Sequence, residues 1–138
     1  MPVTVTDYSH VRLTVSDIAA SRAFYDSVFG FDVAFELPEN PDAETREQLA
    51  FLFGGVIYSF AGGLLGLRPV APGQDMFDED RAGLDHISFT VPDRAALEQA
   101  VEVLDGLGVA HEDIKDIGGM SILEFRDPDN IALELTAG

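Results

Sequence analysis

The chain repeats itself, and this repeat limits the possible fold more than any other feature of the sequence. When His10 is placed over His86, the first copy reads DYSHVRLTVSD and the second reads GLDHISFTVPD. Each copy continues with a stretch whose apolar residues recur at i, i+3, i+4 and i+7, the spacing of an amphipathic helix. Shorter strand-like runs, separated by turn signals, follow each of these stretches. The sequence therefore predicts two successive βαβββ modules.

The repeat also gives provisional bounds for the elements. Ser16 or Asp17, and Asp93, are suitable N-cap residues for the two helices. The predicted helices span residues 18–29 and 95–107, and the predicted strands after them span 32–37, 49–60 and 64–68, then 110–114, 120–125 and 131–136. We expect one domain over residues 1–138, with module one at 7–69, a linker at 70–82 and module two at 83–137. The acidic stretch 75–80 is expected to be a solvated part of that linker.

Composition removes several classes of function. With 25 acidic and eight basic residues the net charge is −17, so nucleic acid and anionic membranes are poor partners. The absence of cysteine excludes disulfides, thiolate metal sites and a cysteine nucleophile. No apolar run is long enough to cross a bilayer, and the first residues, MPVTVTDYSH, do not resemble a signal peptide. We therefore expect a cytoplasmic protein.

Strand alternation separates polar from apolar side chains. In the first strand of module one, His10, Arg12 and Thr14 share one face. In the corresponding strand of module two, His86 shares a face with Ser88 and Thr90, and the last strand turns Glu134 away from its leucines. Two of the three histidines in the chain thus fall at equivalent positions. Periodicity alone leaves two interpretations open, a metal site or solvated histidines on a half-polar sheet.

At this point the sequence resembles the vicinal oxygen chelate superfamily, which includes glyoxalase I, bleomycin resistance proteins, fosfomycin resistance enzymes and extradiol dioxygenases. The resemblance is clearest in GLDHISFTV and in EFRDPDNIALEL, which is similar to the Asp-Pro-x-Gly-Asn turn and following strand of that family. Asn130 stands where a glycine is usual, and asparagine tolerates left-handed backbone angles. The resemblance implies an α+β fold in which two βαβββ modules with curved mixed sheets enclose a central metal-binding cavity.

The resemblance also implies which residues hold the metal. Family ligands come from the first and last strands of each module, which here gives His10, His86 and Glu134. The fourth position falls on Gly66, which has no side chain. Two histidines and one carboxylate form the 2-His-1-carboxylate pattern of non-haem Fe(II) oxygenases. We therefore expect a divalent metal, Fe(II) first, with Mn(II), Zn(II) and Ni(II) as alternatives.

The function expected first is an Fe(II)-dependent dioxygenase of the extradiol type, an oxidoreductase acting on an oxygen-rich aromatic substrate. Arg12 and Arg68 are candidate substrate-binding residues, and Tyr58 and His111 are candidate proton-transfer residues. Glu124 stands where that family has a tyrosine, and Asp85 is given no role because alternation points it away from the site. The alternatives are a glyoxalase-type isomerase or lyase, and a metal-free drug-binding resistance protein, which the charge of −17 would suit. A homodimer is expected from the resemblance.

Overall fold

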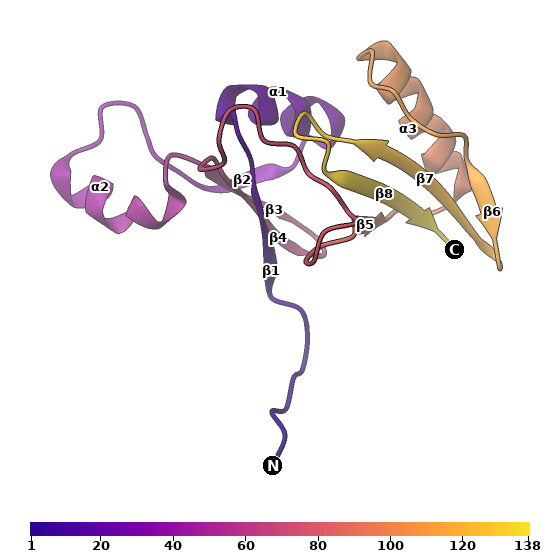
Figure 1. Cartoon of the computed structure of the whole chain (residues 1–138), viewed down its shortest axis with the longest axis horizontal. Coiled ribbons are helices and arrows are strands. Elements are labelled where there is room, and N and C mark those ends of the chain that lie inside the picture. The colour runs from indigo at the N-terminus through magenta and orange to yellow at the C-terminus, as the bar shows by residue number, and fades with distance from the viewer. The chain divides into compact units, whose positions relative to one another are not determined.

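The computed structural model describes all residues from 1 to 138 and divides into two compact units (Figure 1). The first unit is Met1–Gly73 and the second is Gln74–Gly138. Each unit contains a four-stranded mixed sheet, and neither sheet closes into a barrel. The predicted α+β class with two βαβββ modules is confirmed. No helix in either unit combines the length and apolarity that a membrane span requires.

The first unit builds its sheet in the order β1-β4-β3-β2. Its elements are β1 (His10–Thr14), α1 (Ile18–Val28), β2 (Asp32–Glu36), α2 (Ala43–Gln48), the 3-10 turn η1 (Ala50–Leu52), β3 (Val56–Phe60) and β4 (Gly63–Arg68). Strand β1 pairs with β4 in parallel, and the other neighbours are antiparallel. Helix α1 begins where the carboxylate of Asp17 accepts hydrogen bonds from two backbone N–H groups, and it ends before Gly30, which adopts a φ of +63°.

The second unit repeats this arrangement in the order β5-β8-β7-β6. Its elements are β5 (Ile87–Thr90), α3 (Arg94–Gly106), β6 (Lys115–Ile117), β7 (Met120–Arg126) and β8 (Ala132–Ala137). Strands β5 and β8 are parallel, as β1 and β4 are in the first unit. Asp93 caps α3 by accepting from the N–H of Ala96. Asn130 has a φ of +67°, so the asparagine in the β7–β8 turn does adopt the left-handed conformation expected of it.

Each unit has its own core between one sheet face and one helix. In the first unit Leu13, Leu67 and Tyr58 are buried on the face next to Tyr25 of α1. In the second unit Leu123 and Leu133 are fully buried, and burial alternates strictly along β8; the buried leucines Leu97 and Leu104 belong to α3. Burying each such leucine stabilises the fold by about 1.5–3 kcal/mol. The opposite face carries polar side chains in both sheets, among them His10 and Arg12 in the first and Ser88 and Glu134 in the second.

Two predicted strands were wrong. Residues 49–60 were expected to form one strand, but Ala50–Leu52 form a 3-10 turn and only Val56–Phe60 are extended, because Phe53 and Gly54 take positive φ angles. Residues 110–114 were also expected to be a strand. Only His111 pairs there, through an isolated bridge to Phe125, and the edge strand β6 begins at Lys115 instead.

Residues 74–82 of the predicted linker belong to the second unit. The N–H of Phe77 donates to the carbonyl of Asp129 at 2.8 Å, and the side-chain amide of Asn130 donates to the carbonyl of Phe77 at 3.0 Å. Arg126 forms a bidentate ion pair with Glu79, with N···O distances of 2.7 and 3.0 Å. The acidic stretch 75–80 is therefore not simply a solvated linker, because these contacts fix it against the β7–β8 turn.

Candidate metal centre

On the polar face of the second sheet, the candidate functional side chains lie on and next to one strand, β8. Pairing register places Ser88 of β5 and Glu124 of β7 directly beside Glu134 of β8, so these three side chains share a face. His86 immediately precedes β5. A cleft of about 390 Å³ opens on this side of the unit. Its polar lining includes Glu79, Asp85, His86, Glu124, Arg126 and Glu134.

His86 and Glu134 are the two predicted ligands that the second unit brings together. The Nε2 atom of His86 lies 3.8 Å from the Oε2 atom of Glu134. An imidazole nitrogen at about 2.0–2.1 Å and a carboxylate oxygen at about 2.0–2.2 Å from one ion are at most about 4.3 Å apart, so this pair can share a divalent ion. Glu134 is largely shielded, with 14% of its side chain exposed, whereas His86 is 44% exposed. Neither unit by itself gathers three candidate ligand side chains.

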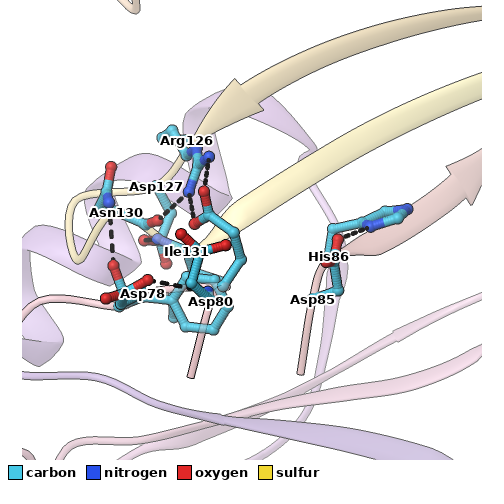
Figure 2. Close-up of polar contacts among 10 residues, drawn as sticks. Asp78, Asp80, Asp85, His86, Arg126, Asp127, Asn130 and Ile131 are labelled. Carbon is cyan, nitrogen blue, oxygen red and sulfur yellow. Dashed lines mark hydrogen bonds and ion pairs between the residues drawn. The ribbon is translucent and has the colours of Figure 1, made fainter. Parts of the chain in front are cut away.

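Asp85 holds the other nitrogen of the His86 ring. Its Oδ1 atom lies 2.6 Å from His86 Nδ1 (Figure 2). A carboxylate at Nδ1 keeps the proton there and leaves the lone pair of the neutral ring on Nε2, the atom that faces Glu134. This hydrogen bond is also the main cause that raises the pKa of His86, with Glu134 adding a smaller electrostatic contribution. Strand alternation gave Asp85 no role because it was applied to residues that lie before β5 begins.

Glu134 is oriented by hydroxyl groups on the same sheet face. The hydroxyl of Thr136 donates to Glu134 Oε1 at 3.0 Å, and Ser88 Oγ lies 2.5 Å from Thr136 Oγ1. Because the proton of Thr136 is directed to Glu134, the proton between Ser88 and Thr136 belongs to Ser88. One carboxylate oxygen is thus held by the protein, and the other faces His86. The donor set fits a divalent ion bound through one oxygen and one imidazole nitrogen.

His10, the third predicted ligand, belongs to the first unit. It is exposed at the start of β1, and its Nδ1 atom lies 2.8 Å from the hydroxyl oxygen of Ser9. The preceding residue therefore engages Nδ1 in both histidines, Ser9 for His10 and Asp85 for His86. Both modules thus have a histidine at this position and a preceding residue that contacts its Nδ1 atom.

Pairing register also identifies the equivalent of Glu134 in the first unit. Gly66 pairs with Arg12, two residues after His10, just as Glu134 pairs with Ser88, two residues after His86. The position equivalent to Glu134 is therefore Gly66, as the repeat predicts. Arg12 and Arg68 lie on the same face of the first sheet as His10, because each is an even number of positions from His10 or from its partner Leu64.

Tyr58 lies on the opposite face of the first sheet. It pairs with Leu65, whereas His10 pairs with Leu64. Its ring is fully buried, and its hydroxyl donates to Asp26 of α1 at 2.8 Å. Burial and the hydrogen bond to Asp26 raise its pKa well above the usual range. Tyr58 stabilises the contact between α1 and the sheet and is not placed to donate a proton on the face that carries His10.

His111 uses both of its ring nitrogens within the fold. Nδ1 lies 2.7 Å from the carbonyl oxygen of Glu112, and Nε2 lies 2.7 Å from Oδ1 of Asp105. Both partners accept hydrogen bonds, so together they favour the doubly protonated ring, and they raise the pKa of His111. The ring of His111 therefore joins the end of α3 to the segment that follows the helix, and it has no free nitrogen for proton transfer.

Comparison with known proteins places this chain in a family. Residues 8–135 match the model of the Glyoxalase/Bleomycin resistance protein/Dioxygenase superfamily. The uncharacterized protein YwkD of Bacillus subtilis is 31% identical over 128 residues, which covers 91% of this chain and 92% of that protein. YaeR of Escherichia coli, also uncharacterized, is 29% identical over the same length, with the same two coverages. The chain belongs to the Glyoxalase/Bleomycin resistance protein/Dioxygenase superfamily.

Solved structures agree with this assignment. A glyoxylase/bleomycin resistance protein/dioxygenase domain from Frankia is 30% identical, with a TM-score of 0.77 over 98% of this chain and 93% of that one. Lactoylglutathione lyase from Agrobacterium tumefaciens has a TM-score of 0.70 at 20% identity, over 97% of this chain and 95% of its own. The fosfomycin resistance protein FosX from Listeria monocytogenes, in a complex with Mn(II) and dihydroxypropylphosphonic acid, has a TM-score of 0.74 at 20% identity, over 98% and 94%. The last two likenesses show the shared fold.

Proposed function

We propose that this protein is a divalent-metal-dependent enzyme whose substrate is a small molecule with two adjacent oxygen atoms. The observation that carries this proposal is the pair formed by His86 and Glu134. Their facing atoms lie 3.8 Å apart, and Asp85 and Thr136 hold the atoms that face away. A solvated sheet face needs no such arrangement, because each of these side chains would be satisfied by water.

His10 is proposed as the third ligand. It occupies the position of His86 in the other module, and its Nδ1 atom is engaged by the preceding residue in the same way. When bound, the metal would act as a Lewis acid toward the adjacent oxygen atoms of the substrate. Fe(II), Mn(II), Zn(II) and Ni(II) all accept two imidazoles and one carboxylate. The Mn(II) present in FosX favours a divalent ion of this kind.

Proton transfer next to those oxygens is the reaction that the arrangement of side chains supports best, as in a glyoxalase-type isomerase or lyase. Glu124 lies directly beside Glu134 on the polar face, lines the cleft and is 43% exposed. A carboxylate there can take a proton from a substrate carbon and return it to a neighbouring atom. The candidates for an oxygenase, Tyr58 and His111, are both occupied by hydrogen bonds within the fold.

The second candidate is the Fe(II) dioxygenase of the extradiol type, acting on an oxygen-rich aromatic substrate. The observation that favours it is Gly66, which contributes no fourth ligand and leaves more of the ion available to substrate and O₂. The two candidate reactions differ in their use of O₂, because only the dioxygenase consumes it.

The test begins with metal-free protein reconstituted with each of the four ions. We expect anaerobic isomerisation of hemithioacetals, or exchange of solvent deuterium into α-hydroxyketones, with at least one ion. Glu124→Gln should lower kcat by about 100-fold or more while leaving metal affinity unchanged. Oxygen uptake with catechols under Fe(II), without anaerobic turnover, would establish the dioxygenase instead. If no ion binds, the metal-free drug-binding alternative replaces both.

A further inference from the structure

The polar face of the first sheet carries two arginines that have no carboxylate partner. In a chain with 25 acidic and eight basic residues, an unpaired half-buried guanidinium is unexpected. Arg22, Arg94 and Arg126 all form ion pairs, with shortest distances of 2.6, 3.0 and 2.7 Å. Arg12 and Arg68 form none. Both are partly buried on the face that carries His10, so solvent exposure does not explain their lack of a partner.

Arg12 lies flat across Gly66. These residues are direct partners in the β1–β4 register. A Cβ atom added at Gly66 would lie 2.8 Å from Cγ of Arg12 and 3.3 Å from its Nε, closer than side chains normally approach. The glycine therefore does more than omit a metal ligand. It makes room for a guanidinium at the position where the second unit has the carboxylate of Glu134.

The guanidinium of Arg12 is fixed by the protein but not satisfied by it. Nη2 donates to the carbonyl oxygen of Phe51 at 2.8 Å. Nε is buried and has no acceptor. Buried donors without an acceptor are uncommon in native proteins. A positively charged group that is anchored and still short of acceptors is suited to binding an anion.

Arg68 is held by an aromatic ring. Its guanidinium carbon lies 4.2 Å from the ring centre of Phe53, a cation–π contact that leaves the edges of the group free to donate. Phe53 has a φ of +52°, a conformation that is strained for a bulky residue. Phe53 is 54% exposed. Phe51 and Phe35, which are 44% and 46% exposed, have their ring centres 6.2 Å apart.

We infer that Arg12 and Arg68 form a subsite for an oxyanion carried on an apolar body. The guanidinium groups bind the oxyanion, and the exposed phenylalanine rings contact the apolar part. The inference rests on the proposed function in one respect, that this ligand is the substrate or part of it. The subsite narrows the proposed substrate to a carboxylic or phosphonic acid that also carries the two adjacent oxygen atoms for the metal.

Binding of simple acids to the metal-free, full-length protein tests the subsite separately from metal chemistry. Phenylacetate, benzylphosphonate and the neutral analogue phenylacetamide are titrated while arginine side-chain and backbone amide signals are followed by NMR. We expect at least one acid to bind about tenfold or more tightly than the amide, with shifts at Arg12 and Arg68. If phenylacetate binds more tightly, the oxyanion is a carboxylate. If benzylphosphonate binds more tightly, it is a phosphonate.

Matched variants locate the binding. Arg12→Gln and Arg68→Gln should each weaken acid binding about tenfold, whereas Arg46→Gln, on exposed α2, removes the same charge without effect. Gly66→Ala keeps every charge but moves the Arg12 side chain, so it should also weaken binding. Gly106→Ala is its control, because an added Cβ there meets no neighbour.

Each outcome is decisive. Equal binding of phenylacetate and phenylacetamide, or acid binding that survives Arg68→Gln and Gly66→Ala, overturns the subsite. If Arg12→Gln loses the dispersed NMR spectrum of a folded protein, the result is read from Arg68→Gln and Gly66→Ala, which leave Arg12 in the chain. Because no metal is present, failure of the proposed metal chemistry leaves a positive result intact, and metal binding without acid binding refutes the subsite alone.

Discussion

Each of the three proposed ligands is held by a neighbouring side chain at the atom that does not bind the metal. Ser9 and Asp85 engage Nδ1 of His10 and His86, and Thr136 donates to Oε1 of Glu134. The partners are one or two residues away in sequence, so the local backbone conformation sets them in place. Outer partners of this kind orient the ligands and fix the imidazole tautomer before the metal arrives.

Replacing Asp85 by Asn should weaken metal binding by about 10–100-fold. The amide no longer draws the proton to Nδ1, so the lone pair of His86 is less often on Nε2. Glu102→Gln, on the exposed surface of α3, removes the same charge and should leave affinity unchanged. Competition with a chromogenic chelator measures both variants. Equal affinity for Asp85→Asn and the wild type would show that Asp85 does not orient His86.

At the residue scale, the repeat singled out the two histidines because it compares one module with the other, and the resemblance to the family added Glu134 as the third proposed ligand. It missed Asp85 because alternation holds only within a strand, and β5 begins at Ile87. It also suggested Tyr58 as a proton donor. A tyrosine in a strand lies on one of two faces, and only the register with Leu65 shows that Tyr58 lies on the buried one.

At the element scale, the segment 74–82 is attached to the second sheet through Glu79 and Arg126. Hydrogen bonding to Arg126 lowers the pKa of Glu79 to about 2. The folded-state pKa thus lies below the unfolded value, so the contribution of Glu79 to stability is present above about pH 4.5 and is lost as the pH falls through about 2.

The change Glu79→Gln should therefore make the loss of stability between about pH 4.5 and 2 less steep. The variant should be slightly less stable than the wild type at pH 7 and equally stable near pH 2. Thermal unfolding followed by circular dichroism across this range is the measurement, with Glu102→Gln as the control. Parallel curves for Glu79→Gln and the wild type would mean that the ion pair does not stabilise the fold.

The two long helices were easier to predict than the short helix α2 and the edge strand β6. Both long helices have an aspartate N-cap and an apolar stripe, and they begin within one residue of the predicted positions. The edge strands are short, and β6 is exposed throughout, so it has no alternation to detect. The segment 74–82 was taken for part of a linker, because its acidic composition does not reveal the ion pair with Arg126 and the hydrogen bond from Asn130.

At the scale of the whole molecule, we expect a homodimer. Besides the phenylalanines of the proposed subsite, the first unit exposes further large apolar side chains, including Val33 and Leu37. Exposed apolar surface in a soluble protein is commonly covered by a partner or a ligand. Light scattering after size exclusion should give about twice the chain mass of 14.9 kDa. A monomer mass at micromolar concentration would reject the dimer and leave the metal proposal standing.

We propose that His10, His86 and Glu134 together hold one divalent ion. Elemental analysis of protein reconstituted with Fe(II), Mn(II), Zn(II) or Ni(II) and freed of excess metal tests it most directly. We predict about one ion per chain for the wild type and for Glu102→Gln. We predict a sharp loss for His10→Ala, His86→Ala and Glu134→Ala, and weak binding for Glu134→Gln, which keeps the shape but not the charge. No stoichiometric binding of any of the four ions, or full retention in the three alanine variants, would contradict the account.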